Sequence, residues 1–173
     1  MGKLYAVLAV AALALVMPLS ALADPTTIKM QDDCDPVSFN LAVPGDPPTC
    51  VGGGGTTFGD FVGQLAGHGF AGAWHFSPGH VTIDAGSSLR IVNQGGETHT
   101  FTQVTQFGGG GIVPPLNEIL FGTPSPPTFF FGAFNFVPAG QSTTIGPDIL
   151  TPGTHRLFCA IHPWMEETVV VKG

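Results

Sequence analysis

The sequence predicts an all-β protein built as a β-sandwich with Greek-key connections. About six to eight short runs rich in β-branched and aromatic residues are separated by turn residues at regular intervals. Hydrophobic residues make up 43% of the chain, enough for a core, while 25 Gly and 16 Pro among 173 residues indicate many turns. No long amphipathic helix competes with this pattern, and the length fits one domain.

Residues 1–23 have the features of an export signal. Lys3 precedes an apolar run from Leu4 to Val16, and the small-residue sequence Ala21-Leu22-Ala23 follows, so we expect cleavage after Ala23. The run is shorter than the roughly 20 residues of a membrane span, which favours a cleaved signal. The alternative is that this segment stays uncleaved as an N-terminal membrane anchor. The sequence therefore predicts an exported protein, periplasmic or extracellular, without a stable membrane anchor.

Residues 24–67 form a predicted N-terminal extension ahead of a single β-domain at 68–173. Cys34 and Cys50 lie in one polar segment that contains several prolines, far from Cys159. In an exported protein we expect these two to form a disulfide, which closes a loop of about 17 residues and is worth roughly 3 kcal/mol. A disulfide to Cys159 is the alternative. We expect most of the extension to be an irregular arm stapled by the disulfide.

The other elements follow from the spacing of apolar residues and turn signals. Phe58, Phe61 and Leu65 are spaced as on a short helix within residues 56–67, although interspersed glycines weaken that prediction. Downstream, seven runs have the alternation or β-branched content of strands: 73–76, 81–83, 89–92, 99–104, 142–145, 154–158 and 168–171. Short turns separate the first three of these strands.

Residues 107–127 form a predicted Pro/Gly-rich insertion between two strands. The run Gly108–Gly111 and several prolines indicate a long excursion, with one helical turn at Leu116–Leu120. Five phenylalanines follow it closely: Phe129, Phe130, Phe131, Phe134 and Phe136. We favour a core strand for this cluster over an exposed patch that docks a partner.

Three soft metal ligands lie together between the last two predicted strands. Cys159, His162 and Met165 have the spacing C-x2-H-x2-M. Two His, one Cys and a weak axial Met form the ligand set of a blue-copper electron-transfer site. His99, which begins a predicted strand after a turn-rich segment, is the candidate for the remaining His.

These two segments resemble the halves of the type 1 copper site in the cupredoxins, the plastocyanin and amicyanin group. Gly153-Thr154 and Cys159 match the strand G-T-x4-C of that family, and His99 follows Asn93 by six residues, as the upstream ligand does there. The spacing C-x2-H-P-x-M is similar to that of amicyanin. After the first His the family usually has Asn, which braces the loops and the cysteine sulfur, but this chain has Thr100.

The resemblance implies a Greek-key sandwich with its ligand loops at one end, and one copper per chain that alternates between Cu(I) and Cu(II). The implied ligands are three strong ones and a weak axial one: His99, Cys159, His162 and Met165. Asn93 and Thr100 would support them through hydrogen bonds. The implied function is one-electron transfer between redox partners, without catalysis.

Three other functions remain open. A copper-binding or storage protein would use the same site. A copper oxidase or nitrite reductase would need further His clusters, such as H-x-H pairs, which the sequence lacks. A structural zinc site is the nearest chemical rival, although zinc seldom takes a thioether ligand.

Four other histidines and Glu97 lie outside this candidate ligand set. His75 and His80 flank a turn and could hold a second metal, but we expect them, like His68, on the surface. The strand alternation predicts an internal hydrogen bond for His155. Glu97 would give a site with a harder ligand if it approached the metal.

The charge narrows the class of partner. Loss of the signal removes Lys3 and changes the formal charge from −7 to −8. So acidic a chain is a poor nucleic-acid binder. We expect a monomer with basic protein redox partners, such as a cytochrome or a copper oxidoreductase, attracted by long-range electrostatics.

Overall fold

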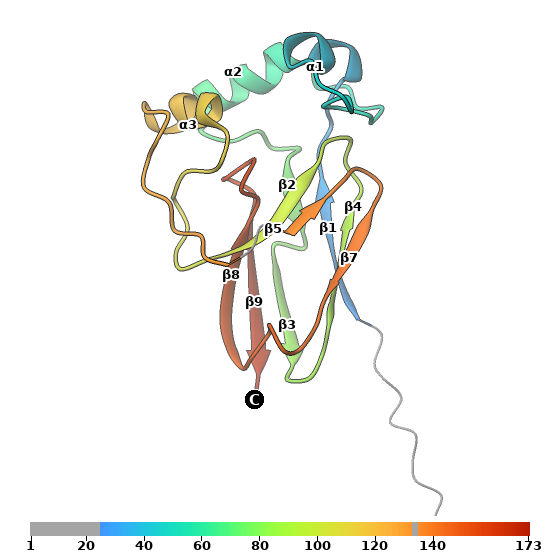
Figure 1. The fold of residues 1–173 in the computed structure, drawn as a ribbon, viewed down its shortest axis with the longest axis vertical. Coiled ribbons are helices and arrows are strands. Elements are labelled where there is room, and N and C mark those ends of the chain that lie inside the picture. The colour runs from blue at the N-terminus through green and yellow to red at the C-terminus, as the bar shows by residue number, and fades with distance from the viewer. Residues whose placement is uncertain (1–24, 133–134) are drawn as a thin grey trace, which may run out of the picture.

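The computed structural model describes residues 25–132 and 135–173 as two β-sheets with three helices gathered at one end (Figure 1). The C-terminus lies at the opposite end from the helices. The predicted signal peptide, residues 1–23, lies outside the described residues. Within the described part of the chain, no helix has the length and apolar character needed to cross a membrane.

Nine strands form the two sheets of the described chain. The four-stranded sheet has the order β2 (His75–Ser77), β1 (Thr26–Gln31), β4 (Leu89–Asn93) and β7 (Ser142–Ile145). The five-stranded sheet has the order β3 (His80–Asp84), β9 (Glu166–Lys172), β8 (Gly153–Phe158), β5 (His99–Val104) and β6 (Asn135–Val137). Consecutive strands repeatedly change sheet, as in Greek-key sandwiches. The predicted fold class is confirmed.

The larger of two hydrophobic clusters in the described part of the chain takes buried side chains from both sheets. In β1, Ile28 and Met30 are fully buried while Lys29 between them is exposed, as the period of two in a strand requires. Leu157 of β8 and Val169 of β9 belong to the same core cluster from the other sheet. Each such side chain contributes roughly 1.5–3 kcal/mol through burial, so alternation fixes which face of each strand points inward.

The N-terminal extension is part of the sandwich, contrary to the prediction of an irregular arm. β1 lies between β2 and β4 and pairs in parallel with β4, from Thr26 opposite Leu89 to Met30 opposite Asn93. The sandwich therefore begins at Thr26 and not at residue 68. A six-residue strand with only two inward apolar side chains is a weak signal in sequence, since its stability comes from pairing with distant strands.

The disulfide between Cys34 and Cys50 is confirmed, and helices flank it. α1 (Pro36–Ala42) begins where the side chain of Asp35 accepts a hydrogen bond from the backbone N–H of Ser38, at 2.8 Å. The predicted helix within 56–67 is confirmed as α2 (Phe58–His68). Thr57 caps its first turn, and Gly69 ends it in the left-handed conformation, φ 76°.

The Pro/Gly-rich insertion packs on the rest of the molecule. α3 (Pro114–Phe121) is longer than the single turn that we predicted. The Asn117 side chain accepts from the N–H of Gly111 at 2.9 Å and donates to its carbonyl at 3.0 Å. The next N–H, of Ile112, donates to the carbonyl of Ala160 at 2.7 Å, which ties the insertion to the loop after Cys159.

The predicted core strand in the phenylalanine cluster is wrong. Phe131 and Phe136 are about half exposed, at 50% and 53%. Phe130 is partly buried and stacks on Phe158 with a centroid distance of 6.2 Å, while Phe134 lies outside the described residues. The strand described there is the three-residue β6 at the sheet edge, where alternate side chains face away from the core.

Glu167 is a charged residue in the core. It lies on β9 opposite Leu157, its side chain is fully buried, and neither carboxylate oxygen has a hydrogen-bond partner among the described residues. Burial raises the pKa of Glu167 from 4.5 to about 8, and the backbone of Thr168 lowers this pKa by a smaller amount. Folding therefore favours the protonated acid, so this residue costs stability progressively as pH rises from about 4.5 to about 8.

We expect Glu167→Gln to raise the free energy of unfolding at pH 8 by about 1–3 kcal/mol, because the variant buries no charge. The gain should be smaller at pH 5, where wild-type Glu167 is already mostly protonated in the folded state. Urea unfolding of the metal-free protein at the two pH values measures both. Glu118→Gln on the exposed surface of α3 is the matched control. A gain that is equal at both pH values would contradict the assignment of the pKa.

Candidate metal centre

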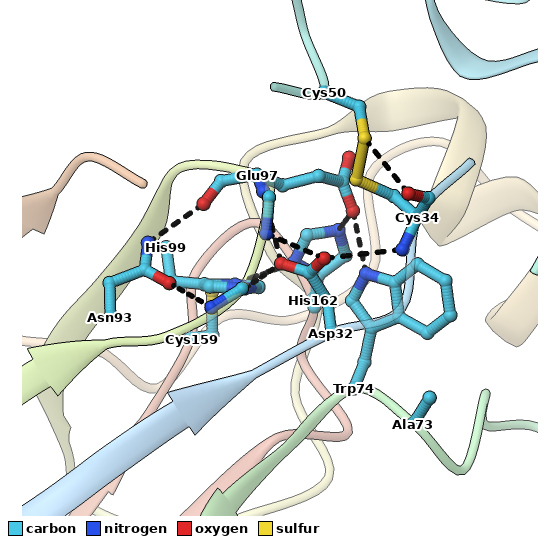
Figure 2. Close-up of polar contacts among 12 residues, drawn as sticks. Asp32, Cys34, Cys50, Ala73, Trp74, Asn93, Glu97, His99, Cys159 and His162 are labelled. Carbon is cyan, nitrogen blue, oxygen red and sulfur yellow. Dashed lines mark hydrogen bonds and ion pairs between the residues drawn. A yellow bond between two sulfur atoms is a disulfide. The ribbon is translucent and has the colours of Figure 1, made fainter. Parts of the chain in front are cut away.

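Three predicted ligands converge in the structure. The Nδ1 atoms of His99 and His162 lie 3.2 Å apart, and the Sγ atom of Cys159 lies 3.7 Å and 3.8 Å from them, respectively (Figure 2). A point in their plane and equidistant from all three atoms is about 2.1 Å from each, close to the ~2.0–2.3 Å of metal–nitrogen and metal–sulfur bonds. All three side chains are buried, and the described residues contain no other such group of His, Cys, Asp and Glu.

The two sheet segments that carry these ligands are held by backbone hydrogen bonds. His99 is the first residue of β5, and Cys159 directly follows β8, which pairs with β5. The backbone N–H of Cys159 closes the loop that follows it by donating a hydrogen bond to the carbonyl of Met165 at 3.0 Å. Within the loop, the N–H of Met165 donates to the carbonyl of His162 at 2.9 Å. The positions of the ligands are therefore fixed by the strands and by this short loop.

Met165, the predicted axial ligand, is fully buried in this loop and belongs to the hydrophobic core cluster. Its backbone position next to Cys159 agrees with the prediction. Its role as a ligand stays a prediction.

Thr100 braces the cysteine, where the cupredoxin motif would have Asn. Its backbone N–H donates to Sγ of Cys159 at 3.3 Å, and its hydroxyl oxygen accepts from the N–H of Ala160 at 2.7 Å. Thr102 donates to the same hydroxyl oxygen at 3.1 Å. The predicted supporting role of Thr100 thus has a structural basis, because these bonds tie β5 directly to the cysteine loop.

The surroundings of Cys159 favour the thiolate. Burial alone would raise the pKa of the thiol, but hydrogen bonds and charge from His162 and His99 hold this pKa well below its usual value of 9.0. The N–H of Thr100 adds a donor that a thiolate accepts. A deprotonated sulfur is the form that binds a metal ion.

Asp32, just after β1, is a functional residue that the sequence reasoning missed. Its Oδ2 lies 2.8 Å from Nε2 of His99, and both side chains are buried. A carboxylate on the far nitrogen of a candidate ligand fixes the imidazole so that Nδ1 points toward the other ligands. The same Asp32 carboxylate accepts the N–H groups of Gly96 at 2.9 Å and Glu97 at 3.0 Å.

The charges of this pair are coupled. Burial would raise the pKa of Asp32, but hydrogen bonds from His99 and from the two backbone N–H groups lower it to about 2. For His99, burial would lower the pKa, while the bond to Asp32 and the nearby Cys159 raise it to about 9. Without a metal, the pair therefore carries opposite charges near neutral pH.

The loop between β4 and His99 has no room for larger residues. A Cβ on Gly95 would collide with the Asp32 carboxylate, and one on Gly96 would lie 2.6 Å from Cα of Gly52 and 2.7 Å from Sγ of Cys34. The amide of Asn93 donates to the carbonyls of Glu97 at 2.7 Å and Val137 at 2.8 Å. Asn93 thus holds the loop that leads to His99, and its predicted role in supporting a metal ligand stays a prediction.

Glu97 approaches the second histidine and not the ligand triangle. Its Oε2 accepts a hydrogen bond from Nε1 of Trp74 at 2.6 Å and lies 3.6 Å from Nε2 of His162 (Figure 2). Burial raises the pKa of Glu97, partly offset by His162 and Trp74. Each of the two histidines therefore has an acidic side chain near its Nε2, a hydrogen-bonded one at His99 and one at 3.6 Å at His162.

Aromatic side chains separate the site from solvent beneath the helices. The ring of Trp164 lies 5.3 Å from that of His162, and the ring of Phe61 on α2 lies 6.2 Å from it. Trp74 packs on Phe61 at 4.7 Å. His162 is only 2% exposed. Phe61 of α2 and Trp164 of the loop after Cys159 thus shield His162 from solvent.

The remaining histidines stay outside this group. His68, His75 and His80 are exposed, and the structure does not bring the last two into a metal-binding cluster of the described residues. The ring of His155 lies 2.7 Å from the carbonyl of Thr151 and 3.3 Å from the Gln103 side chain, so it has partners within the chain, although the first contact is exposed to solvent and not in the core as the strand alternation predicted.

No protein-family model and no curated protein matches the chain. Among solved structures, a novel purple cupredoxin from Nitrosopumilus maritimus is 14% identical, with a TM-score of 0.45 and coverage of 85% of this chain and 99% of that one. Amicyanin from Paracoccus versutus is 19% identical, with a TM-score of 0.36 and coverage of 57% and 73%. A mutant of amicyanin in its Cu(I) form is 14% identical, with a TM-score of 0.37 and coverage of 59% and 76%. All three identities are below 20%, and all three TM-scores are below 0.5.

Proposed function

We propose that this protein holds one copper ion in a type 1 site and carries single electrons between redox partners. The observation that carries the proposal is the triangle of His99 Nδ1, His162 Nδ1 and Cys159 Sγ, whose size would suit one metal ion held by all three atoms. Two imidazoles and one thiolate in a trigonal arrangement are the strong ligands of a blue-copper site. Met165 completes the proposed set as the weak axial ligand.

Copper bound there would supply the Cu(II)/Cu(I) couple, which exchanges one electron without forming or breaking bonds in the protein. The protein's part is to hold the ligands still and to exclude water. Asp32 holds His99, Thr100 holds Cys159, and the closed loop holds His162. Strong ligands that cannot relax suit fast electron transfer, because little reorganisation accompanies a change in metal charge.

A zinc site and a catalytic copper site have less support. Structural zinc is usually enclosed by four Cys or His ligands, whereas the described residues bring only three such groups together. Copper catalysis needs an open position for substrate, but each of the three ligands is at most 2% exposed. Storage of copper would use the same residues and differs from electron transfer only in the need for a redox partner.

The test is the visible absorption spectrum of the protein after addition of Cu(II). We expect an intense thiolate-to-copper band at one copper per chain. Cys159→Ser should abolish that band, because a hydroxyl cannot provide the charge transfer, while Met165→Leu should keep the band, shift it and raise the reduction potential. A wild-type protein that stays colourless with Cu(II), or a Cys159→Ser variant that keeps the band, would refute the type 1 site.

Electron transfer is tested apart from metal binding. We propose export to the periplasm or cell exterior, and soluble protein partners that carry positive charge, since the sequence is acidic. Stopped-flow mixing of the reduced copper protein with an oxidised basic cytochrome c should show fast electron exchange that slows as salt is added. Stable copper binding without exchange with any such acceptor would favour storage.

A further inference from the structure

A cavity of about 240 Å³ lies between the helices and the metal end of the sandwich. Helices α1, α2 and α3 all contribute to its walls, through residues such as Phe39, Phe61 and Leu116. Its lining reaches His162 but includes neither His99 nor Cys159. It is therefore a space beside the candidate metal site and not the metal site itself.

The size and lining of the cavity favour one aromatic ring. Three phenylalanine side chains, Phe39, Phe58 and Phe61, form part of the wall, and most of the other lining residues are aliphatic. An apolar cavity of about 150 Å³ in another protein holds benzene, whereas pockets for drug-sized ligands begin near 300 Å³. The volume here fits a single ring with a small substituent.

The polar lining residues are Thr49, Glu97 and His162, and the side chains of the last two lie 3.6 Å apart. The two polar contacts of the Glu97 carboxylate, to Trp74 and to His162, both use Oε2. Oε1 makes no hydrogen bond to the described residues, so on this cavity-lining side chain it is the carboxylate oxygen left for a bound molecule.

We propose that this cavity binds a small uncharged phenol, with its ring among the phenylalanines and its hydroxyl group donating a hydrogen bond to Oε1 of Glu97. The apolar wall supplies affinity through burial of the ring, and Glu97 supplies the preference for a hydroxyl substituent. The site does not depend on the proposed copper function, because its walls are complete without a metal.

The test uses the metal-free protein and a matched pair of ligands, phenol and toluene, which differ by a hydroxyl in place of a methyl group. Isothermal titration calorimetry gives the affinities, and NMR chemical shifts of His162 and Phe61 report the location. We expect phenol to bind at least tenfold more tightly than toluene, because only phenol can donate to Glu97. Absence of phenol binding at millimolar concentration, or equal affinity for the two ligands, would overturn the proposal.

Blocking variants test the location. Val43 ends α1, lines the cavity and is 42% exposed, so Val43→Trp can fill the entrance with little strain on the core. We expect it to weaken phenol binding at least tenfold. Leu41→Trp, on the same helix but 83% exposed and outside the lining, should bind as the wild type does. Leu116→Phe is a second blocking variant should Val43→Trp fold poorly. Wild-type affinity in a folded blocking variant would place the ligand elsewhere.

Discussion

Replacing Asp32 by Asn is expected to raise the reduction potential of the copper-loaded protein by about 100 mV. The Asp32 carboxylate bonds to Nε2 of His99, and the proposed copper would bind Nδ1 on the other side of the ring, so the two charges would lie on the order of 6 Å apart. At an effective dielectric constant near 20, the negative charge of Asp32 would favour Cu(II) over Cu(I) by roughly 3 kcal/mol. Asn keeps an oxygen that accepts from Nε2 of His99. The variant therefore removes the charge and keeps the position of the ring, and cyclic voltammetry at fixed pH measures the shift.

Asp33→Asn is the matched control for this measurement. Asp33 is the next residue and carries the same charge, but it is exposed and its contacts are to Thr56 and Gly55. Water and salt screen an exposed charge, so we expect a shift several times smaller. Equal shifts in the two variants, or a lower potential in Asp32→Asn, would show that Asp32 does not act on His99 in the proposed way.

Removal of the disulfide, as Cys34→Ser with Cys50→Ser, is expected to lower the free energy of unfolding of the metal-free protein by about 3 kcal/mol. The bond closes a loop with a sequence separation of 16 and constrains the unfolded chain. For a domain of this size the loss corresponds to a decrease of about 10 °C in melting temperature. Differential scanning calorimetry measures the change.

Wild-type protein treated with a thiol reductant is the control for the disulfide, and it should melt near the temperature of the double variant. We expect the double variant still to bind Cu(II) with the wild-type visible band, because neither sulfur belongs to the ligand triangle. A melting temperature within about 2 °C of the wild type would mean that the packing around Gly96 and not the disulfide holds this end of the molecule.

The sequence pointed to residues that the structure brings together, His99, Cys159 and His162, and their role as metal ligands stays a prediction. Cys159 and His162 are three residues apart in one loop, so the chain itself keeps them close together regardless of how the strands pair. The Asn93 motif then pointed to His99 on a separate strand. Strand periods are also local, which explains why β3, β4, β7, β8 and β9 were found close to their observed bounds.

The features that the sequence analysis missed or predicted wrongly depend on contacts between segments far apart in the chain. Asp32 and His99 are 67 positions apart, and nothing in the polar sequence around Asp32 marks it as a partner of a metal ligand. Similarly, the alternation in β1 is visible in the sequence, but its place between β2 and β4 follows from pairing that no local pattern encodes. The phenylalanine cluster misled because hydrophobicity alone does not tell a core strand from an edge strand.

The first and last strands of the described sandwich each occupy an interior place in a sheet. β1 pairs with β4, and β9, near the C-terminus, lies between β3 and β8. Because both parallel pairings join segments far apart in the chain, loop closure must precede most of the stabilising contacts, and folding is expected to take milliseconds to seconds. A ribosome-bound chain that has not yet released residues 166–172 cannot complete the sheet that carries His99 and Cys159. The group of His99, Cys159 and His162 would thus form only after β9 has paired with β3 and β8.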